Sequence, residues 1–219
     1  MGFPRIMLDT AEMDQIKDAV STGLIDGIAT NPQKVARTGK SYRQVVLEIR
    51  RFFDGPIAVQ ALGCDREEIC VCARRLHQID PLLAVKITAN KEGLAAVKIL
   101  AAEGVRTNAT LIFNPTQGLL AGLAGSPYIS PFIGRAMMCG YNGIETIRTI
   151  KRLYQSFGIS ETCIIAASIK DVEQVIDAVT AGADCVAVPF DVFEAMCVHP
   201  LTSEGLAAFT ADYATIPQD

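Results

Sequence analysis

Short apolar runs alternate with amphipathic stretches along the whole chain. The apolar runs are rich in β-branched residues and predict strands at Arg5–Asp9, Gly27–Thr30, Ile57–Gln60, Leu83–Ile87, Arg106–Ile112, Tyr128–Phe132, Cys163–Ser168 and Cys185–Pro189. The stretches between them place apolar residues about 3.6 positions apart. They predict helices at Ala11–Ser21, Tyr42–Phe53, Arg66–Gln78, Glu92–Glu103, Gly143–Ser156 and Asp171–Thr180. Gly104, Gly158 and Gly182 stand where a helix should stop before the next strand.

Eight strands that alternate with helices in steps of roughly 25 residues are typical of a (β/α)8 barrel, the TIM barrel. No linker or change of composition divides the sequence, so we expect residues 1–219 to form a single domain. A doubly wound open sheet is the competing fold. It would usually carry a glycine-rich phosphate loop after its first strand, and LDTAEMD at 8–14 is no such loop. The tail from about residue 202 to 213 predicts an extra helix that either packs on a neighbouring subunit or closes one end of the barrel.

The composition narrows the class of protein. Hydrophobic residues make up 50% of the chain and charged residues 20%, which indicates a packed core and argues against disorder. The net charge of -4 comes from interspersed acids and bases, so no basic stripe predicts a nucleic-acid partner. The N-terminal segment has no apolar signal region, and no window approaches the ~18 apolar residues of a membrane span. We therefore expect a soluble cytoplasmic protein without a nucleic-acid or membrane partner.

Seven cysteines, at positions 64, 70, 72, 139, 163, 185 and 197, lie mostly in apolar surroundings. In an intracellular protein of this size such residues are usually buried thiols. Cys64, Cys70, Cys72 and His77 could be interpreted as a metal site, but their spacing fits no common zinc pattern. The segment also predicts a helix, which would scatter these side chains around its surface, so we expect no metal.

In a barrel of this type, catalytic side chains lie at the carboxyl ends of the strands. The polar residues that close an apolar run are Asp9, Thr30 with Asn31, Gln60, Lys86, Asn108 with Thr110, Ser130 and Ser168. Alternation along a strand places Asp9 on the same face as Met7, and Lys86 on the same face as Ala84. We therefore expect several of these polar groups to converge at one mouth of the barrel.

Lys86 is the most informative of these residues. A lysine inside LLAVKIT at 82–88 is costly to bury while charged, so burial should lower its pKa and leave a neutral amine. A neutral amine is what attack on a ketone carbonyl requires. The alternative interpretation is a lysine whose ammonium reaches water from a strand end. The strand-end polar groups opposite favour the nucleophile.

Asp9 closes the first strand and is the only carboxylate that does so on this face. It could cap the next helix, but Thr10 can fill that role. We therefore assign Asp9 to proton transfer at a substrate hydroxyl, which carbon–carbon bond cleavage next to an imine requires. Gln60 and Thr110 are neutral hydrogen-bonding residues suited to holding the water that forms and hydrolyses the imine.

Arg135, Ser168 and Lys170 follow the sixth and seventh strands, where barrels often bind phosphate. The alternative interpretation is that these residues are ordinary surface cations. For Lys170 alone, this interpretation is as good as a phosphate site. A bound phosphate would explain two cations at an otherwise apolar mouth.

Segments spread over nearly the whole chain resemble the small transaldolase and fructose-6-phosphate aldolase family. They are LDT at 8–10, ATNP at 29–32, VKIT at 85–88, EGLAAVKIL at 92–100, TNATLIF at 107–113, QGLLAGLAG at 117–125, SPFIGR at 130–135 and AASIK at 166–170. The resemblance implies a (β/α)8 barrel without metal or cofactor, and a Schiff base between a lysine and a dihydroxyacetone unit. It also implies a decamer of two pentameric rings in which the C-terminal helix reaches a neighbouring subunit.

The resemblance assigns the roles of the family's site residues to the positions of this chain that match the motifs. Lys86 becomes the imine lysine and Asp9 the acid/base. Thr110 joins the residues that handle water. Substrate binding falls to Thr30, Asn31, Asn108, Ser130 and Phe132. Arg135 and Ser168 bind phosphate, and Lys170 is a weaker candidate for that role.

The two branches of the family differ at two positions, and this chain has one residue typical of each branch. Transaldolases usually have glutamate in the third strand and phenylalanine in the SPF motif, whereas the aldolases have glutamine and tyrosine. This chain has Gln60 from one pattern and Phe132 from the other. It also has Ala29 where a hydroxyl residue is usual and Gln33 where serine is usual, which allows a changed sugar preference.

The leading hypothesis is a transaldolase-type enzyme of carbohydrate metabolism, in the pentose phosphate pathway, that moves a dihydroxyacetone unit between sugar phosphates. The alternative from Gln60 is an aldolase that releases free dihydroxyacetone. A more distant alternative is a barrel that has lost its chemistry and keeps a binding role.

Overall fold

The computed structural model describes residues 5–217. Within that range, eight parallel strands close a barrel in sequence order, each hydrogen-bonded to the next and the last to the first. The strands are β1 (Ile6–Asp9), β2 (Gly27–Ala29), β3 (Ile57–Gln60), β4 (Ala84–Thr88), β5 (Thr107–Ile112), β6 (Tyr128–Pro131), β7 (Cys163–Ala166) and β8 (Cys185–Val188). The predicted (β/α)8 barrel is confirmed.

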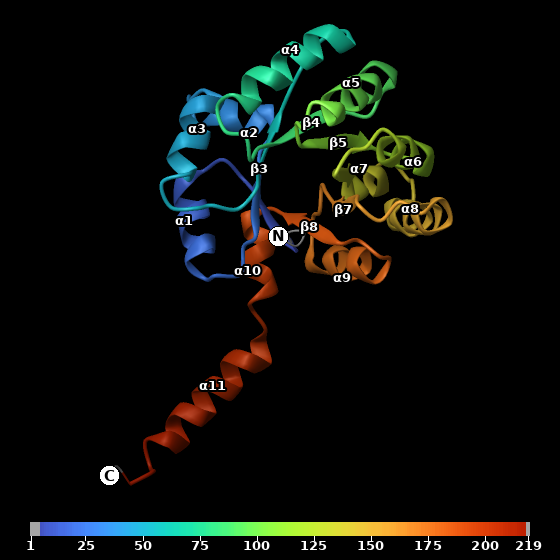
Figure 1. The fold of residues 1–219 in the computed structure, drawn as a ribbon. Helices are drawn as coiled ribbons and strands as arrows, with labels where there is room; N and C mark the ends of the chain where they lie inside the picture. Colours follow the sequence, from blue (N-terminus) through green and yellow to red (C-terminus); the bar gives the residue numbers. More distant parts are fainter. Residues whose placement is uncertain (1–4, 218–219) are drawn as a thin grey trace.

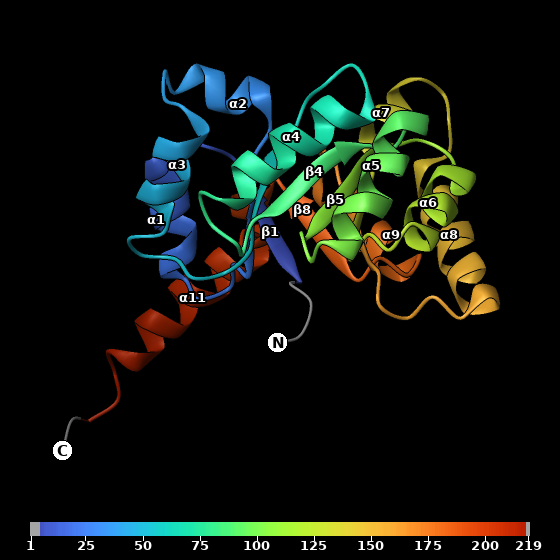
Figure 2. The same ribbon diagram turned by 45° about the horizontal axis from the view of Figure 1, so that its top comes forward.

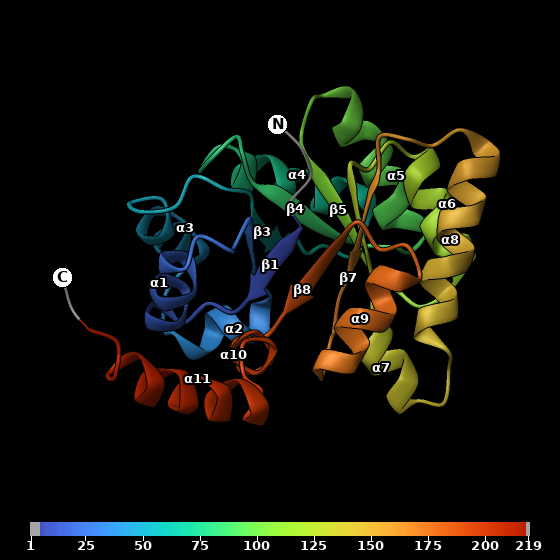
Figure 3. The same ribbon diagram turned by 90° about the horizontal axis from the view of Figure 1, so that it is seen from below.

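Helices surround the barrel on its outer side (Figures 1 and 3). They are α1 (Met13–Ser21), α2 (Pro32–Arg37), α3 (Tyr42–Ile49), α4 (Arg66–His77), α5 (Lys91–Ala102), α6 (Pro115–Leu123), α7 (Ile133–Met138), α8 (Gly143–Phe157), α9 (Val172–Thr180), α10 (Phe190–Met196) and α11 (Pro200–Tyr213). Helices α2, α6, α7 and α10 were absent from the sequence-based prediction. Helices α2, α7 and α10 have six or seven residues, so their apolar periodicity is too brief to stand out from a loop, and α6 contains two glycines, which are poor helix formers.

Helix ends follow local chemistry. Asp65 caps α4 by accepting a hydrogen bond from the amide of Glu68, and acids fill the first turn and bases the last, as the helix dipole favours. Gly158 ends α8 in the left-handed conformation that glycine adopts most easily. Gly104 and Gly182 also have positive φ, so the predicted helix stops are confirmed.

The apolar residues form two layers. The larger lies between the sheet and the helices and includes Leu8, Ile57 and Leu100, all fully buried. The smaller fills the barrel itself and consists mostly of small side chains: Met7, Ala29, Ala58, Ala84, Cys163, Ile165, Cys185 and Ala187. Small interior residues leave room above them at the carboxyl ends of the strands, which is where the site lies.

Helix α11 is the exception to the compact arrangement. It projects away from the barrel (Figures 1 and 2), and none of its residues is buried. Its apolar residues are largely exposed, with Phe209 at 74% and Leu201 at 68%. The predicted extra helix is therefore present and begins two residues earlier than expected.

Small differences concern the strand ends. Thr30, Phe132 and Ser168, predicted as the last residues of their strands, lie just beyond β2, β6 and β7. Ser168 has a φ of 62°, in the left-handed region, so the chain turns at this residue rather than continuing the strand. No helix within residues 5–217 is long and apolar enough to cross a membrane.

Candidate active site

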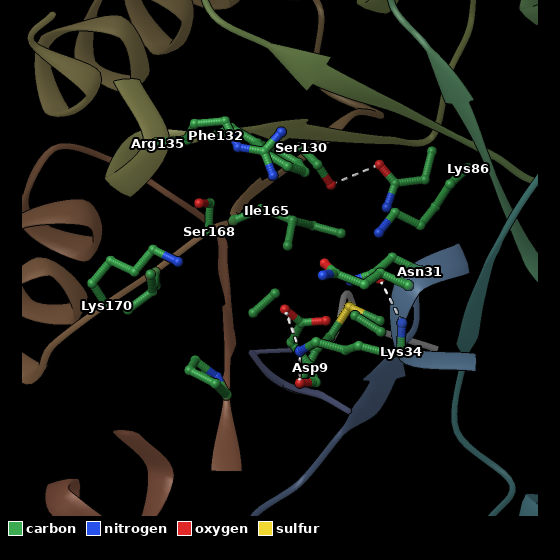
Figure 4. Close-up of a pocket in the computed structure, with 18 residues that line it drawn as sticks. Asp9, Asn31, Lys34, Lys86, Ser130, Phe132, Arg135, Ile165, Ser168 and Lys170 are labelled. Atoms are coloured by element: carbon green, nitrogen blue, oxygen red, sulfur yellow. Dashed lines mark hydrogen bonds and ion pairs between the residues drawn. The ribbon is translucent and has the colours of Figure 1, made fainter. Parts of the chain in front are cut away.

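A cavity of ≈ 190 Å³ opens at the carboxyl ends of the strands (Figure 4). Most of the predicted site residues line it: Asp9, Asn31, Lys86, Asn108, Ser130, Phe132, Arg135, Ser168 and Lys170. They come from β1, β4, β5, β6 and the segments that follow β2, β6 and β7. The closed barrel therefore brings together side chains up to 161 positions apart, from Asp9 to Lys170.

Lys86 extends from β4 towards the cavity and is 7% exposed. Its neighbours across the sheet are Gln60 on β3 and Asn108 on β5. The amine donates a hydrogen bond to the backbone carbonyl of Thr30 at 2.9 Å. Burial lowers the pKa of Lys86, which the nearby carboxylate of Asp9 opposes and the ammonium of Lys34 reinforces. The amine is therefore more readily neutral, and hence nucleophilic, than an ordinary lysine.

Asp9, at the end of β1, carries the carboxylate that faces this amine across the cavity. It pairs with Lys34 on α2, whose Nζ lies 2.8 Å from the Oδ2 of Asp9. The same ammonium donates to the backbone carbonyl of Asp9. Lys34 itself lines the cavity, and sequence reasoning missed it because it belongs to a helix and not to a strand end.

Neutral hydrogen-bonding groups occupy the space between the charges. Asn31 caps α2 by accepting from the amide of Lys34 at 3.0 Å, which leaves its own NH2 group for a ligand. On the facing strands, the hydroxyl of Ser130 donates to Oδ1 of Asn108 at 2.8 Å. These amides and hydroxyls can bind the hydroxyl groups of a polyol.

Two cations stand on the other side of the cavity. Arg135 on α7 and Lys170 after β7 both line it, and within residues 5–217 neither has an acidic group within salt-bridge distance. Ser168 lies between them in Figure 4. A side chain at Gly134 would collide with the carbonyl of Ser168, so glycine at this position is what allows α7 to approach the β7 end.

The ring of Phe132 packs against the guanidinium group of Arg135. The guanidinium carbon of Arg135 lies 5.3 Å from the centre of the Phe132 ring, which is cation–π geometry. The same ring meets Phe113 edge-on, with ring centres 5.9 Å apart. Phe132 thus offers the cavity a flat apolar surface and no hydroxyl.

Three of the predicted residues do not line the cavity. The hydroxyl of Thr30 donates to the carbonyl of Ala58 at 2.8 Å. The amide nitrogen of Gln60 donates to the carbonyls of Ala61 and Lys86, both at 3.1 Å. Thr110 is buried, and its hydroxyl has no hydrogen-bond partner among the described residues. Ala29 and Gln33, by contrast, are part of the cavity wall.

The cysteines are free thiols, and three of the seven, Cys64, Cys139 and Cys197, are exposed. Burial raises the pKa of Cys163 in the barrel interior to about 12, so this thiol is inert as a nucleophile at neutral pH. The part of the chain that the structure describes contains no group of three or more histidine, cysteine, aspartate or glutamate side chains that could hold a metal ion.

The fold and the cavity define a class of protein: a (β/α)8 barrel with a buried lysine, a carboxylate opposite it and unpaired cations at one mouth. The chain belongs to the transaldolase/fructose-6-phosphate aldolase family, whose sequence model matches residues 6–218. It is 41% identical to a probable transaldolase of Dictyoglomus turgidum over 214 residues, 98% of this chain and 100% of that one. It is 44% identical to probable transaldolase 1 of Listeria monocytogenes over 209 residues, 95% of this chain and 97% of that one.

A more distant solved structure shares the fold alone. It is a putative lactate oxidase of Pediococcus acidilactici, matched with a TM-score of 0.61 at 14% identity. The match covers 84% of this chain and 62% of that one.

Proposed function

We propose that the protein is a transaldolase-type enzyme that transfers a dihydroxyacetone unit between phosphorylated sugars through a Schiff base on Lys86. The observation that carries the proposal is the buried amine of Lys86, whose pKa burial lowers, in a cavity shared with Asp9. Membership of the family and its relatives named as probable transaldolases support the same reaction.

The amine of Lys86 attacks the keto carbon of a donor sugar, and the carbonyl oxygen leaves as water when the C=N bond forms. Asp9 then accepts the proton of the hydroxyl on the β carbon. The bond between the α and β carbons breaks, its electron pair moves towards the imine, and an aldehyde departs. An acceptor aldehyde takes the retained unit by the reverse steps, in which Asp9 returns the proton. Water finally releases the new ketose and restores the amine.

Binding roles follow from the two sides of the cavity. Asn31, Asn108 and Ser130 hold the hydroxyls of the dihydroxyacetone unit, because their amide and hydroxyl groups lie beside Lys86. Arg135, Ser168 and Lys170 hold the anionic end, because two cations that have no acidic partner among the described residues face the cavity there. Gln60, Thr110 and Thr30 support the site from outside the cavity, with Thr110 offering a hydroxyl to water.

Trapping with borohydride tests the chemistry. Incubation with fructose 6-phosphate and borohydride should add the reduced ketose irreversibly to Lys86, as read by peptide mass spectrometry. Lys86→Met should abolish the adduct, whereas Lys98→Met, on helix α5 outside the barrel, should not. If no ketose phosphate gives an adduct with the unaltered protein, the barrel has a binding role without the chemistry.

An aldolase that releases free dihydroxyacetone is the second candidate, and Gln60 in the third strand favours it. Turnover of fructose 6-phosphate with and without erythrose 4-phosphate separates the two. A transferase needs the aldehyde acceptor for sustained turnover. Release of glyceraldehyde 3-phosphate at the same rate without acceptor would establish the aldolase and remove the transferase.

The proposal extends to assembly, location and pathway. The exposed apolar residues of α11 support docking on a neighbouring subunit within a decamer of two pentameric rings. Light scattering should give about ten times the mass of one chain, and deletion of α11 should reduce it.

Seven free cysteines support a reducing cytoplasmic location, which cell fractionation can test. A place in the pentose phosphate pathway requires activity with erythrose 4-phosphate as acceptor.

A further inference from the structure

Among the described residues, Lys34 is the charged cavity residue to which the proposed chemistry gives no role. It lies in the first turn of α2, three residues after the Asn31 cap, and its side chain turns back to β1. There it contacts both the carboxylate and the backbone carbonyl of Asp9. The side chain is 25% exposed and that of Asp9 22%, so the pair lies at the cavity wall and not on the open surface.

Two amines therefore compete for one carboxylate. Lys86 and Lys34 both line the cavity with Asp9, but Lys34 forms the ion pair, at 2.8 Å. The amine of Lys86 is bonded instead to a neutral backbone carbonyl, that of Thr30. Figure 4 shows the carboxylate of Asp9 drawn to the side of Lys34, with the end of the Lys86 side chain separate from it.

The other titratable and charged groups around Lys86 do not alter this competition. Arg135 and Lys170 lie across the cavity, on α7 and after β7. Tyr128, Cys163 and Cys185 in the barrel have pKa values raised by burial, so they are neutral at ordinary pH. On the outer helices, Arg66 pairs with Glu92 and Arg74 with Glu103, and no strong field from them reaches the interior.

We propose that Lys34 is a positioning residue that holds the carboxylate of Asp9 and thereby leaves the amine of Lys86 without an ionic partner. Without Lys34, Asp9 becomes the counter-ion of Lys86 and keeps it as an ammonium, which cannot attack a carbonyl. With Lys34 in place, the carboxylate is held beside the substrate and the amine of Lys86 gives up its proton more readily. This inference deepens the proposed function and rests on it for its catalytic consequence.

The protonation of Lys86 can be measured with and without substrate. In the first arm, the rate of borohydride-trapped adduct formation from fructose 6-phosphate is followed against pH. In the second, trace acetic anhydride labels the lysines at each pH, and mass spectrometry compares Lys86 with the surface residue Lys40. The second arm reports the same ionisation even in a protein that forms no Schiff base, so it separates failure of this inference from failure of the proposed function.

Lys34→Met removes the ammonium and keeps most of the side-chain stem. We expect it to raise the pH midpoint of both arms by about one unit, because an opposite charge within a few ångströms shifts an ionisation by about that much or more. One unit below the original midpoint, adduct formation should therefore fall about tenfold. Lys34→Arg keeps the ion pair and should stay within about threefold of the unaltered protein. Arg37→Gln, which removes an exposed cation from the same helix, should leave the midpoint unchanged.

A double-mutant cycle assigns the effect to Asp9. In an Asp9→Asn background, Lys34→Met should shift the labelling midpoint of Lys86 by less than half as much, because no carboxylate remains to be released. Circular dichroism checks the fold of each variant, and Lys34→Gln replaces Lys34→Met if the latter is unfolded. An unchanged midpoint in both arms, or an equal shift from Arg37→Gln, would overturn the proposal.

Discussion

Replacement of Phe132 by leucine tests whether the aromatic face, and not merely an apolar side chain, sets the anion affinity of the cavity. Leucine keeps an apolar group of similar reach at the end of β6 but offers no π face to Arg135. The guanidinium lies 5.3 Å from the ring centre, and Arg135 is an exposed residue. Cation–π contacts at exposed sites contribute about 0.5–1 kcal/mol. The lost orientation of Arg135 should therefore weaken binding of a phosphorylated substrate by a factor of about two to five.

The assay is steady-state kinetics with a phosphorylated donor and, for comparison, with free dihydroxyacetone as donor. The KM for the phosphorylated donor should rise, while kcat changes little because Phe132 takes no part in proton transfer. Phe113→Leu is the matched control, since it removes the edge-on neighbour at 5.9 Å and leaves the ring beneath Arg135 in place. An equal loss with the unphosphorylated donor would refute the reasoning, because the ring would then act on the reacting carbons and not through Arg135.

Three further outcomes follow from burial and close packing. Burial lowers the pKa of Lys86 below its unfolded value, so between the folded and unfolded pKa values the unfolded chain binds more protons and stability rises with pH. Lys86→Met should therefore raise the urea midpoint more at neutral pH than near pH 10.5. An equal gain at both pH values would contradict this. Gly134→Ala forces a methyl group against the carbonyl of Ser168 and should weaken phosphate binding, measured calorimetrically with inorganic phosphate. Gly205→Ala, where a methyl group would meet open space, should not. Iodoacetamide should leave Cys163 unlabelled in the native protein, because burial raises its pKa to about 12, and label it once urea unfolds the chain.

Much of the site was predictable because a closed parallel barrel gathers its strand ends in one place. Period-2 alternation selected Lys86 and Asp9 without knowledge of the packing, and both line the cavity. The same rule could not tell whether a strand-end polar group faces the cavity or a neighbouring carbonyl. Thr30 and Gln60 satisfy backbone carbonyls instead, a choice fixed by side-chain rotamers and not by position in the strand.

Contacts made by helix residues could not be predicted from the sequence. Lys34 reaches Asp9 across 25 residues, and nothing in its local pattern distinguishes it from a solvated helix lysine. The direction of α11 is equally invisible, since its apolar residues predict a helix that packs somewhere but not where. The barrel and its strand ends could therefore be predicted, whereas the contacts and directions of these helices could not.

The contacts of Gln60 bear on the conflict between the two branches of the family. Both hydrogens of its amide are given to backbone carbonyls, so only its oxygen remains, and an amide oxygen can hold water but cannot take its proton. Phe132 has no hydroxyl, which leaves Thr110 as the buried hydroxyl near the end of β5. A threonine hydroxyl is not a base, and that of Thr110 lies outside the cavity wall. Neither Gln60 nor Phe132 therefore supplies a base that would activate water at the imine, so the proposed transferase is compatible with both residues.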